Sequence, residues 1–398
     1  MKKIFYGKNI YNNNEIKAVV SQLRKSTQMG RNVAEFEEKI SKMFGKKYSL
    51  MVNSGSSALM LAFKVFNFKP NDEIITPCLN FGTAVSSLLH FNLKPIFVDI
   101  DIDTLQINTD LIKKKITKKT KALLIPNLIG NLPDWIKIKK LAKKYNLKII
   151  EDSADTIGHT INNKNTSSIS DIAITSFYGS HIISCAGNGG IFLTNNKKQY
   201  ERAKILRSWG RMSTLIKDSE NINHRLKIKL DGVNYDKKFV FSELGYNFEP
   251  SEIGAAFGLE QIKKFNMFQK KRNENFYAHL KFFSKYKKIF VTPRIVKGVK
   301  TNFLAYPIII KKNKYFSRKK FQIFLENNKI QTRPIFSGNI LRHPAFEFLK
   351  SNVNKVSSFQ NADYIMKQGI LIGCHQGINK LDLKRMHSLI EKFILKYF

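Results

Sequence analysis

The first half of the chain alternates short apolar runs with longer amphipathic segments. The apolar runs are rich in valine, isoleucine or leucine and are flanked by turn or helix signals, as buried strands are. They lie at Tyr48–Asn53, Glu73–Pro77, Pro95–Asp99, Lys121–Pro126, Leu147–Asp152, Ile172–Ser176 and Gly190–Thr194. Between them, apolar residues recur at the spacing of a helix face, for example over Ala58–Val65 and Ile138–Tyr145. Strands that alternate with helices predict an α/β fold with a mostly parallel, seven-stranded sheet covered on both faces.

A second region begins near residue 270. A basic, aromatic-rich helical stretch at Glu252–Lys285 leads into it. A strand is predicted at Phe303–Ile310, a helix at Arg318–Asn327, and a helical C-terminus from Leu381. We therefore expect a large domain over 1–270, with a helical segment at its start, and a smaller α/β domain over 271–398.

Composition narrows the class of protein. The chain has 398 residues, 43% of them hydrophobic, and a formal net charge of +38. The basic residues are dispersed rather than gathered in one arm, which favours a solubility role and an advantage for anionic small substrates over a nucleic-acid partner. No signal peptide and no apolar run of about 20 residues is found, so we expect a cytoplasmic protein without membrane spans. The three cysteines show no CxxC pairing, which fits a reducing compartment.

The segment Ser54-Gly55-Ser56-Ser57 follows one predicted strand and opens a predicted helix. Small residues at a helix N-terminus present backbone N–H groups and hydroxyls to a phosphate. An ordinary strand–helix turn with a serine cap has the same composition, so this segment alone leaves both interpretations open.

Two further candidates stand at the ends of predicted strands. Asp152, next to Glu151, closes one strand, where a carboxylate can face a ligand in a doubly wound sheet. Phe81 follows the strand that ends at Pro77, and its flat face suits a heteroaromatic ring. Read from the residues alone, Glu151 and Asp152 can equally be polar strand ends, and Phe81 can be a core residue.

The segment Ser176-Phe177-Tyr178-Gly179-Ser180-His181 carries a resemblance to a known family. It is similar to the cofactor-anchoring segment of the DegT/DnrJ/EryC1/StrS sugar aminotransferases, which bind pyridoxal 5′-phosphate (PLP). In that family a lysine stands five residues after the serine and forms a Schiff base with PLP. Here the position holds His181, which has no primary amine, and no lysine lies between Lys164 and Lys197. The same family's motifs match in order from about Gly30 to Gln376, which implies an aminotransferase fold of type I and a homodimer with shared sites.

The resemblance assigns roles to particular residues. It implies that PLP, or its aminated form PMP, binds without a covalent bond, with Asp152 at the pyridine nitrogen, Phe81 stacked on the ring and Ser176 at the phosphate. It places Gly55, Ser56 and Ser57 in the phosphate cradle, Asn247 at the phosphate of the neighbouring subunit, and Arg333 and Phe336 at the substrate. Asp155 stands three residues after Asp152, as in the family's dehydratase branch, and is expected to contact the cofactor.

The resemblance is strongest to 3-dehydratases of nucleotide-linked 4-keto-6-deoxyhexoses, enzymes of deoxysugar, lipopolysaccharide and O-antigen biosynthesis. It implies that His181 acts as the base while the C3 hydroxyl leaves, and that an amino donor such as glutamate regenerates PMP. One branch of these enzymes uses an iron–sulfur cluster. With three cysteines in the whole chain, too few for four-thiolate ligation, we expect the branch without a cluster.

The sequence leaves two alternatives open. The stretch from His181 to Gly190 has the length found in lysine-bearing aminotransferases, so the chain can be an aminotransferase relative that lost its lysine. A non-catalytic sensor or binding protein on the same fold is the other.

Overall fold

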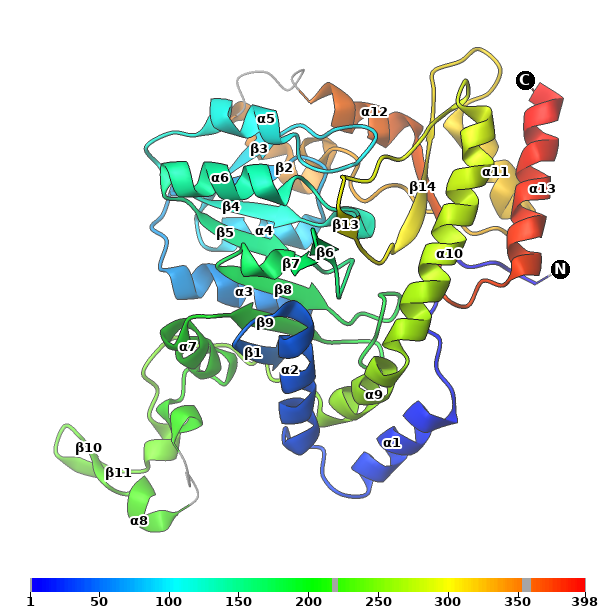
Figure 1. Cartoon of the computed structure of the whole chain (residues 1–398). Helices are drawn as coiled ribbons and strands as arrows, with labels where there is room; N and C mark the ends of the chain where they lie inside the picture. The colour runs from blue at the N-terminus through cyan, green and yellow to red at the C-terminus, as the bar shows by residue number, and fades with distance from the viewer. Residues whose placement is uncertain (1, 217–220, 353–358, 398) are drawn as a thin grey trace.

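A seven-stranded sheet forms the centre of the larger part of the molecule (Figure 1). The computed structural model describes residues 2–216, 221–352 and 359–397. The strand order is β1-β9-β8-β5-β4-β2-β3, and β9 runs antiparallel to both of its neighbours while the other pairs are parallel. The strands are β1 (Tyr48–Val52), β2 (Glu73–Pro77), β3 (Lys94–Val98), β4 (Thr120–Pro126), β5 (Lys148–Asp152), β8 (Ile172–Ser176) and β9 (Gly190–Thr194). All seven predicted strands are therefore confirmed, and so is the α/β class with a mostly parallel sheet.

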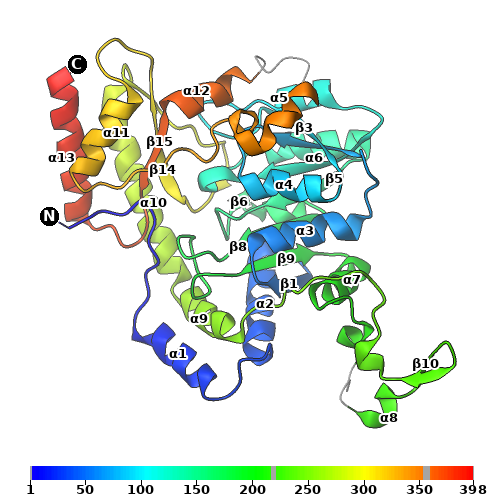
Figure 2. The same cartoon turned by 180° about the vertical axis from the view of Figure 1, so that it is seen from behind.

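Helices cover both faces of this sheet, as Figures 1 and 2 show from opposite sides. On one face, apolar side chains of α3, α4 and α7 pack against alternate residues of the strands. On the other face, α2 and α9 (Glu252–Lys263) cover the β1–β9 end and α6 covers β4 and β5. The helices of this part are α1 (Asn13–Leu23), α2 (Arg31–Phe44), α3 (Gly55–Phe66), α4 (Gly82–His90), α5 (Thr109–Ile112), α6 (Trp135–Tyr145) and α7 (Lys197–Arg207). In the part of the chain that the structure describes, no helix combines the length and apolar character needed to cross a bilayer.

The C-terminal part has a core of its own. Its antiparallel sheet has the order β12-β14-β15, and a phenylalanine-rich cluster fills the space between this sheet and the helices. The N-terminal Ile4 joins this cluster, because its backbone pairs with Lys329 and Gln331. The elements are α10 (Phe265–Phe283), β12 (Phe290–Val291), β14 (Ala305–Ile310), α11 (Arg318–Asn327), α12 (Gln360–Gln368), β15 (Gly369–Gly373) and α13 (Lys380–Tyr397).

The predicted helical stretch at 252–285 consists of two helices. α9 ends at Lys263, Lys264 is its C-cap, and α10 begins at Phe265. Glu252 fixes the start of α2 from a distance, since its carboxylate accepts hydrogen bonds from the backbone N–H groups of Gly30, Asn32 and Val33. The domain division at residue 270 falls inside α10 and stays a prediction.

An arm formed by residues 209–216 and 221–247 projects from the large sheet (Figure 1). It carries α8 (Ile222–Arg225) and the hairpin of β10 (Ile228–Leu230) and β11 (Val233–Tyr235). Large apolar side chains are exposed along it: Trp209, Met212, Leu215, Ile222, Leu226, Leu230, Val233, Tyr235, Phe239, Phe241 and Leu244. A further small sheet has the order β13-β6-β7, with β6 at Thr160–Ile161, β7 at Lys164–Asn165 and β13 at Val299–Lys300.

Candidate active site

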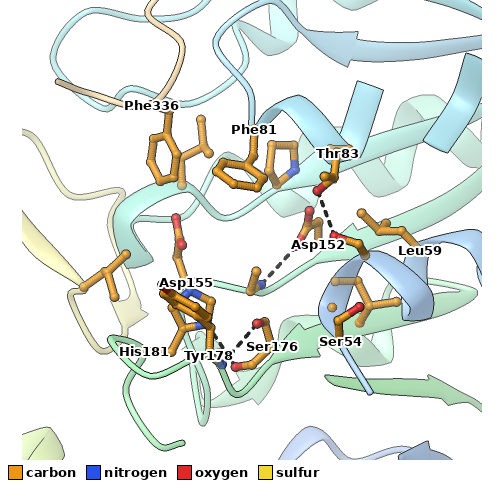
Figure 3. Close-up of a pocket in the computed structure, with 18 of the residues that line it drawn as sticks. Ser54, Leu59, Phe81, Thr83, Asp152, Asp155, Ser176, Tyr178, His181 and Phe336 are labelled. Carbon is orange, nitrogen blue, oxygen red and sulfur yellow. Dashed lines mark hydrogen bonds between the residues drawn. The ribbon is translucent and has the colours of Figure 1, made fainter. Parts of the chain in front are cut away.

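A cavity of about 310 Å³ opens where the carboxyl ends of the parallel strands meet (Figure 3). Loops that leave β1, β2, β5 and β8 all contribute to its wall. Ligands of open α/β sheets bind at this edge because the connecting loops and helix N-termini converge there.

The floor of the cavity includes the N-terminus of α3. Ser54 caps this helix, since its Oγ accepts the backbone N–H of Ser57 at 3.1 Å. Ser56 Oγ donates to Thr83 Oγ1 at 2.9 Å, which brings a hydroxyl of α4 beside it. A side chain at Gly55 would place its Cβ only 2.9 Å from the Cβ of Ser176, so glycine is required for this close approach. The result is a cup of hydroxyls around the positive end of a helix dipole, a natural site for a phosphate.

Neighbouring carboxylates on β5 have opposite environments. Asp152 faces the cavity, and its Oδ1 accepts the N–H of Ala154 at 3.0 Å. It has no ion pair among the described residues, and burial raises its pKa to about 6. Glu151 points to the other face, where His159 Nε2 (2.7 Å) and Thr166 Oγ1 (2.6 Å) contact its Oε1. Burial opposes ionisation of Glu151, but these hydrogen bonds outweigh it and lower its pKa to about 2.

Asp155 lines the cavity beyond Asp152. Its Oδ2 accepts the backbone N–H of Ile129 at 2.8 Å. Ile129 has a left-handed backbone with φ of 60°, a strained conformation for a β-branched residue that aims this N–H at the carboxylate. Burial raises the pKa of Asp155 to about 7 against the effect of that hydrogen bond, and the charge of Asp152 raises it further. Asp155 is therefore able to hold or release a proton near neutral pH.

Two phenylalanines face each other at the cavity's entrance (Figure 3). Phe81, at the start of α4, is 58% exposed, so its ring is presented to the cavity and not to the core. Phe336 meets it edge to face, with ring centroids 6.5 Å apart. Phe336 also has a positive φ of 45°, which is rare for a bulky residue and typical of binding sites.

His181 lies on the opposite wall, on the loop after β8. Its Nδ1 is 3.1 Å from the carbonyl oxygen of Ser176, which can only accept, so Nδ1 carries the hydrogen. Nε2 is then the basic nitrogen, and it makes no hydrogen bond to the described residues. Burial lowers the pKa of His181 to about 4, the Ser176 carbonyl opposes this, and the charge of Arg272 adds to it. His181 is consequently a neutral imidazole with a free lone pair at physiological pH.

A second, outer hollow of about 730 Å³ adjoins the cavity. Tyr6, Phe81, Tyr178, Ser180 and Phe336 border both spaces. Its cationic groups are Lys8 and Arg333, and no acidic residue is among the described residues that line it. The Arg333 guanidinium lies 5.8 Å from the centroid of the Tyr6 ring and donates to the carbonyl of Thr332. The hollow thus combines aromatic walls with positive charge.

The structure unites most of the predicted site residues and leaves three outside the inner cavity. Inside are Gly55, Ser56, Phe81, Asp152, Asp155, Ser176, His181 and Phe336. Ser57 lies beneath the cup, where its Oγ donates to Asn53 Oδ1 at 2.6 Å, and Arg333 stands in the outer hollow. Asn247 is exposed at the base of the arm and does not reach its own chain's cavity.

Several lining residues were not foreseen from the sequence. These are Tyr6, Ser54 as a wall residue, Asn80, Thr83, Asn127, Tyr178 and Asn188. Thr83 could have been found, because it follows Phe81 by two residues in the first turn of α4. Tyr6 could not, because its place depends on the backbone pairing of Ile4 with residues more than 300 positions away.

These features fit PLP on physical grounds. The cup at α3 suits the phosphate, and Phe81 offers a flat face to the ring. Asp152 is a buried carboxylate without a cation, which a protonated pyridine nitrogen would supply. No lysine is among the described residues that line the inner cavity, and Lys8 lies in the outer hollow.

Comparison with known proteins agrees with this geometry. The model of the DegT/DnrJ/EryC1/StrS aminotransferase family matches residues 10–391. The lipopolysaccharide biosynthesis protein RfbH of Salmonella typhimurium is 32% identical, over 92% of this chain and 85% of its own length. The GDP-4-keto-6-deoxy-D-mannose 3-dehydratase of Escherichia coli O55:H7 is also 32% identical, over 91% of this chain and 92% of its own. A solved E. coli enzyme of that name with bound hydrated PLP superposes with a TM-score of 0.86 at 30% identity, over 98% of this chain and 99% of that one.

Sugar aminotransferases are similar to nearly the same degree. The UDP-4-amino-4,6-dideoxy-N-acetyl-beta-L-altrosamine transaminase of Campylobacter jejuni is 29% identical over 91% of both chains. The similarity by itself therefore leaves the choice between dehydration and amino transfer to the residues of the site.

Proposed function

The chain belongs to the DegT/DnrJ/EryC1/StrS aminotransferase family, and from this premise we propose that it is a PLP/PMP-dependent 3-dehydratase of a nucleotide-linked 4-keto-6-deoxy sugar. The observation that carries the proposal is His181. Where the family's lysine would stand, the cavity holds a neutral imidazole whose Nε2 is free. A histidine cannot form the covalent bond that amino transfer uses to recycle the cofactor, but it can take and return a proton.

The residues around the cavity would hold the cofactor without a covalent bond. Gly55, Ser56 and Ser176 would bind its phosphate, Phe81 its ring face, and Asp152 its pyridine nitrogen. Bound in this way, PLP or PMP supplies an electron sink next to the substrate carbon. A solved dehydratase with a PLP–glutamate adduct supports glutamate as the amino donor.

His181 and Asp155 would then take up and release the protons of the reaction. His181 takes one through Nε2 while its Nδ1–H remains fixed on the Ser176 carbonyl, so the ring keeps its orientation as its charge changes. Asp155, whose pKa burial raises to about 7, would contact the cofactor and could hold or release a proton there near neutral pH. The C3–O bond of the sugar breaks, the oxygen leaves as water, and glutamate supplies the two electrons of the net deoxygenation.

The outer hollow would receive the nucleotide-linked sugar. Arg333 supplies a guanidinium that can bind a phosphate through two N–H groups, and Phe336 stands between the two hollows. The relatives named for lipopolysaccharide biosynthesis and for a GDP-linked sugar support a role in surface polysaccharide synthesis from a cytoplasmic nucleotide sugar.

A homodimer would complete the site. Asn247 does not reach the cavity of its own chain, although its main-chain carbonyl accepts a hydrogen bond from Asn53, close to the phosphate cup. The arm exposes a run of large apolar residues that a second copy would cover, with Leu244 87% exposed. We propose that Asn247 of each copy contacts the phosphate bound by the other.

Mixed dimers test this sharing. His181→Asn and Asn247→Asp variants, each inactive alone, are expected to recover part of the activity when co-expressed, because one cavity of the mixed dimer keeps both native residues. The readout is turnover of the tandem-purified hybrid. Absence of recovery in a hybrid of proven dimeric mass would contradict a shared site.

Product analysis tests the proposed reaction itself. The full-length protein is incubated with PLP, glutamate and a GDP-linked 4-keto-6-deoxyhexose, and the sugar is examined by mass spectrometry and NMR. We expect a product that lacks the C3 oxygen, with release of 2-oxoglutarate and ammonia. An amino sugar that retains its C3 oxygen would identify an aminotransferase, which the similar identity of such enzymes makes the second candidate. Tight, salt-sensitive DNA binding without turnover would favour the sensor alternative.

Protonation of His181 is expected to slow the reaction only at unusually low pH. Because burial lowers the pKa of His181 from 6.5 to about 4, this base stays unprotonated until near pH 4, whereas protonation of Asp155, with a pKa of about 7, would affect the rate near neutral pH. The measurement is kcat against pH, with circular dichroism at each pH to exclude unfolding. Loss of activity that is complete well above pH 4, in folded protein, would show that another group or another environment governs the reaction.

A further inference from the structure

Helix α10 carries a polar stripe through the interior of the molecule. Arg272, Asn275 and His279 recur at the spacing of one helix face, and all three are 0% exposed. Polar side chains in such positions are costly unless they are hydrogen-bonded. The side chains of the stripe are therefore expected to have hydrogen-bond partners, and those partners indicate which segments the stripe holds in place.

All three side chains donate to main-chain carbonyls of other segments. Asn275 Nδ2 contacts the carbonyls of Cys374, His375 and Ile378 at 3.0–3.3 Å. His279 Nε2 lies 3.1 Å from the carbonyl of Gly373. The stripe thus fixes the end of β15 and the loop after it against α10.

Arg272 holds two different segments. Its Nη1 donates to the carbonyls of Phe303 and Leu304, each at 3.1 Å, and its Nη2 to the carbonyl of His181 at 3.4 Å. Leu304 itself lines the inner cavity. Arg272 therefore connects the loop that carries the histidine to a second segment of the cavity wall.

The charge of Arg272 is not needed for these hydrogen bonds. No carboxylate forms an ion pair with it among the described residues, and its Nε has no hydrogen-bond partner there. Burial lowers its pKa only to about 10, so it remains a cation at neutral pH. A fully buried, uncompensated cation is expensive, whereas a neutral amide could donate to the same carbonyls.

Several titratable residues line the same cavity as His181, and they bear on what the charge of Arg272 does. Asp152 and Asp155 approach from the β5 side, Tyr6 from the N-terminal segment, and Tyr178 from the histidine's own loop. Burial is the main cause of the low pKa of His181, and the charge of Arg272, held next to the histidine's main chain, lowers that pKa further.

We propose that Arg272 is a positioning residue for His181: it holds the histidine's main-chain carbonyl and places a buried positive charge next to the imidazole. The role in catalysis rests on the proposed function. The effect on the ionisation of His181 does not, and it can be measured without substrate.

Two variants separate the charge from the hydrogen bonds. Arg272→Gln keeps N–H donors for the carbonyls and removes the charge, while Arg272→Lys keeps the charge with different donor geometry. Asn275→Leu is the matched control, because it removes an uncharged member of the same stripe. The ionisation of His181 is followed in the full-length protein, with and without added PLP, by the pH dependence of deuterium exchange at the imidazole C2 position, read for each peptide by mass spectrometry.

We expect the titration of His181 to move up by about one pH unit in Arg272→Gln and to stay near the native value in Arg272→Lys. Asn275→Leu should lower the unfolding temperature and leave the titration unchanged. In Arg272→Gln, the acid limb of kcat should move up with the titration.

A His181 titration that is unchanged in Arg272→Gln, or that moves equally in Arg272→Lys and Asn275→Leu, would overturn the proposal. If Arg272→Gln does not fold, the test rests on Arg272→Lys, which keeps the charge. A raised titration of His181 in Arg272→Lys would then overturn the proposal. Native protein that shows the expected exchange results but no dehydration would refute the proposed function and leave the role of Arg272 standing.

Discussion

Replacing His181 by asparagine is expected to slow removal of the C3 hydroxyl by about 10²–10⁴-fold. Asparagine keeps the polarity and approximate size of the side chain, and its amide can still donate to the Ser176 carbonyl, but it has no basic nitrogen. Affinity for PLP should change little, because the phosphate cup, Phe81 and Asp152 are untouched. The measurement is a single turnover with PMP and the keto sugar, together with PLP binding followed by absorbance.

The control for this variant is His343→Asn. His343 borders the outer hollow and does not line the inner cavity, and its Nε2–H donates to the Ser337 carbonyl at 2.8 Å, so it is not placed where His181 stands. We expect it to retain most of the rate. Dehydration at the native rate in His181→Asn would exclude His181 as the base.

His181→Lys gives a complementary spectroscopic result. A primary amine at this position is expected to form a covalent bond with PLP that borohydride traps, whereas the native protein should release its PLP on dialysis. A solved relative that carries an adjacent serine-to-asparagine and histidine-to-lysine change superposes on this chain with a TM-score of 0.85 at 30% identity. A borohydride-stable adduct in the native protein would contradict non-covalent binding.

Replacing Asp152 by asparagine is expected to have opposite effects on cofactor affinity and on stability. Loss of a buried charged partner costs roughly 2–5 kcal/mol, so affinity for PLP should fall at least tenfold, and turnover with it. In cofactor-free protein, by contrast, the ionised Asp152 carboxylate destabilises the fold. Its folded pKa of about 6 lies above the unfolded value of 3.8, so its contribution to stability is fully present below the unfolded value and is lost as pH rises through about 6.

Above pH 6, therefore, cofactor-free Asp152→Asn should be more stable than the native protein, by up to about 3 kcal/mol. Urea unfolding with and without PLP measures both effects in one series. Glu151→Gln is the matched control, because this neighbouring carboxylate is already ionised by its hydrogen bonds on the other face of β5. The Glu151→Gln variant should be less stable than the native protein, without a direct loss of PLP affinity. Equal PLP affinity in native and Asp152→Asn protein would remove Asp152 from the cofactor site.

Much of the fold could be read from the chain because it depends on local patterns. Buried parallel strands require continuous apolar runs, and each such run in the first half is a strand of the sheet. The α11 prediction at Arg318–Asn327 matches the observed bounds. The break between α9 and α10 at Lys264 was missed, because the apolar pattern continues across it and nothing local requires a stop.

The candidate site was predictable where its residues follow strand ends. Asp152, Ser176 and Phe81 each stand at or just after the carboxyl end of a strand, so the topology that the pattern predicts also brings them together. Tyr6 and Arg272 reach the site through contacts between distant segments, which leave no periodic signal. Asn247, placed by resemblance, stays a prediction that only a partner copy can fulfil.

By itself, the sequence determined the sheet, the strand-end site and the exchange of lysine for histidine, since these depend on residue type and on neighbours within a few positions. Only the tertiary structure decided the state of that histidine. The Ser176 carbonyl fixes its tautomer, burial removes its charge, and Arg272 from α10 adds an uncompensated positive charge close by. The reason is physical: a pKa depends on desolvation and on charges within a few ångströms, and those distances exist only after segments far apart in the chain have packed together.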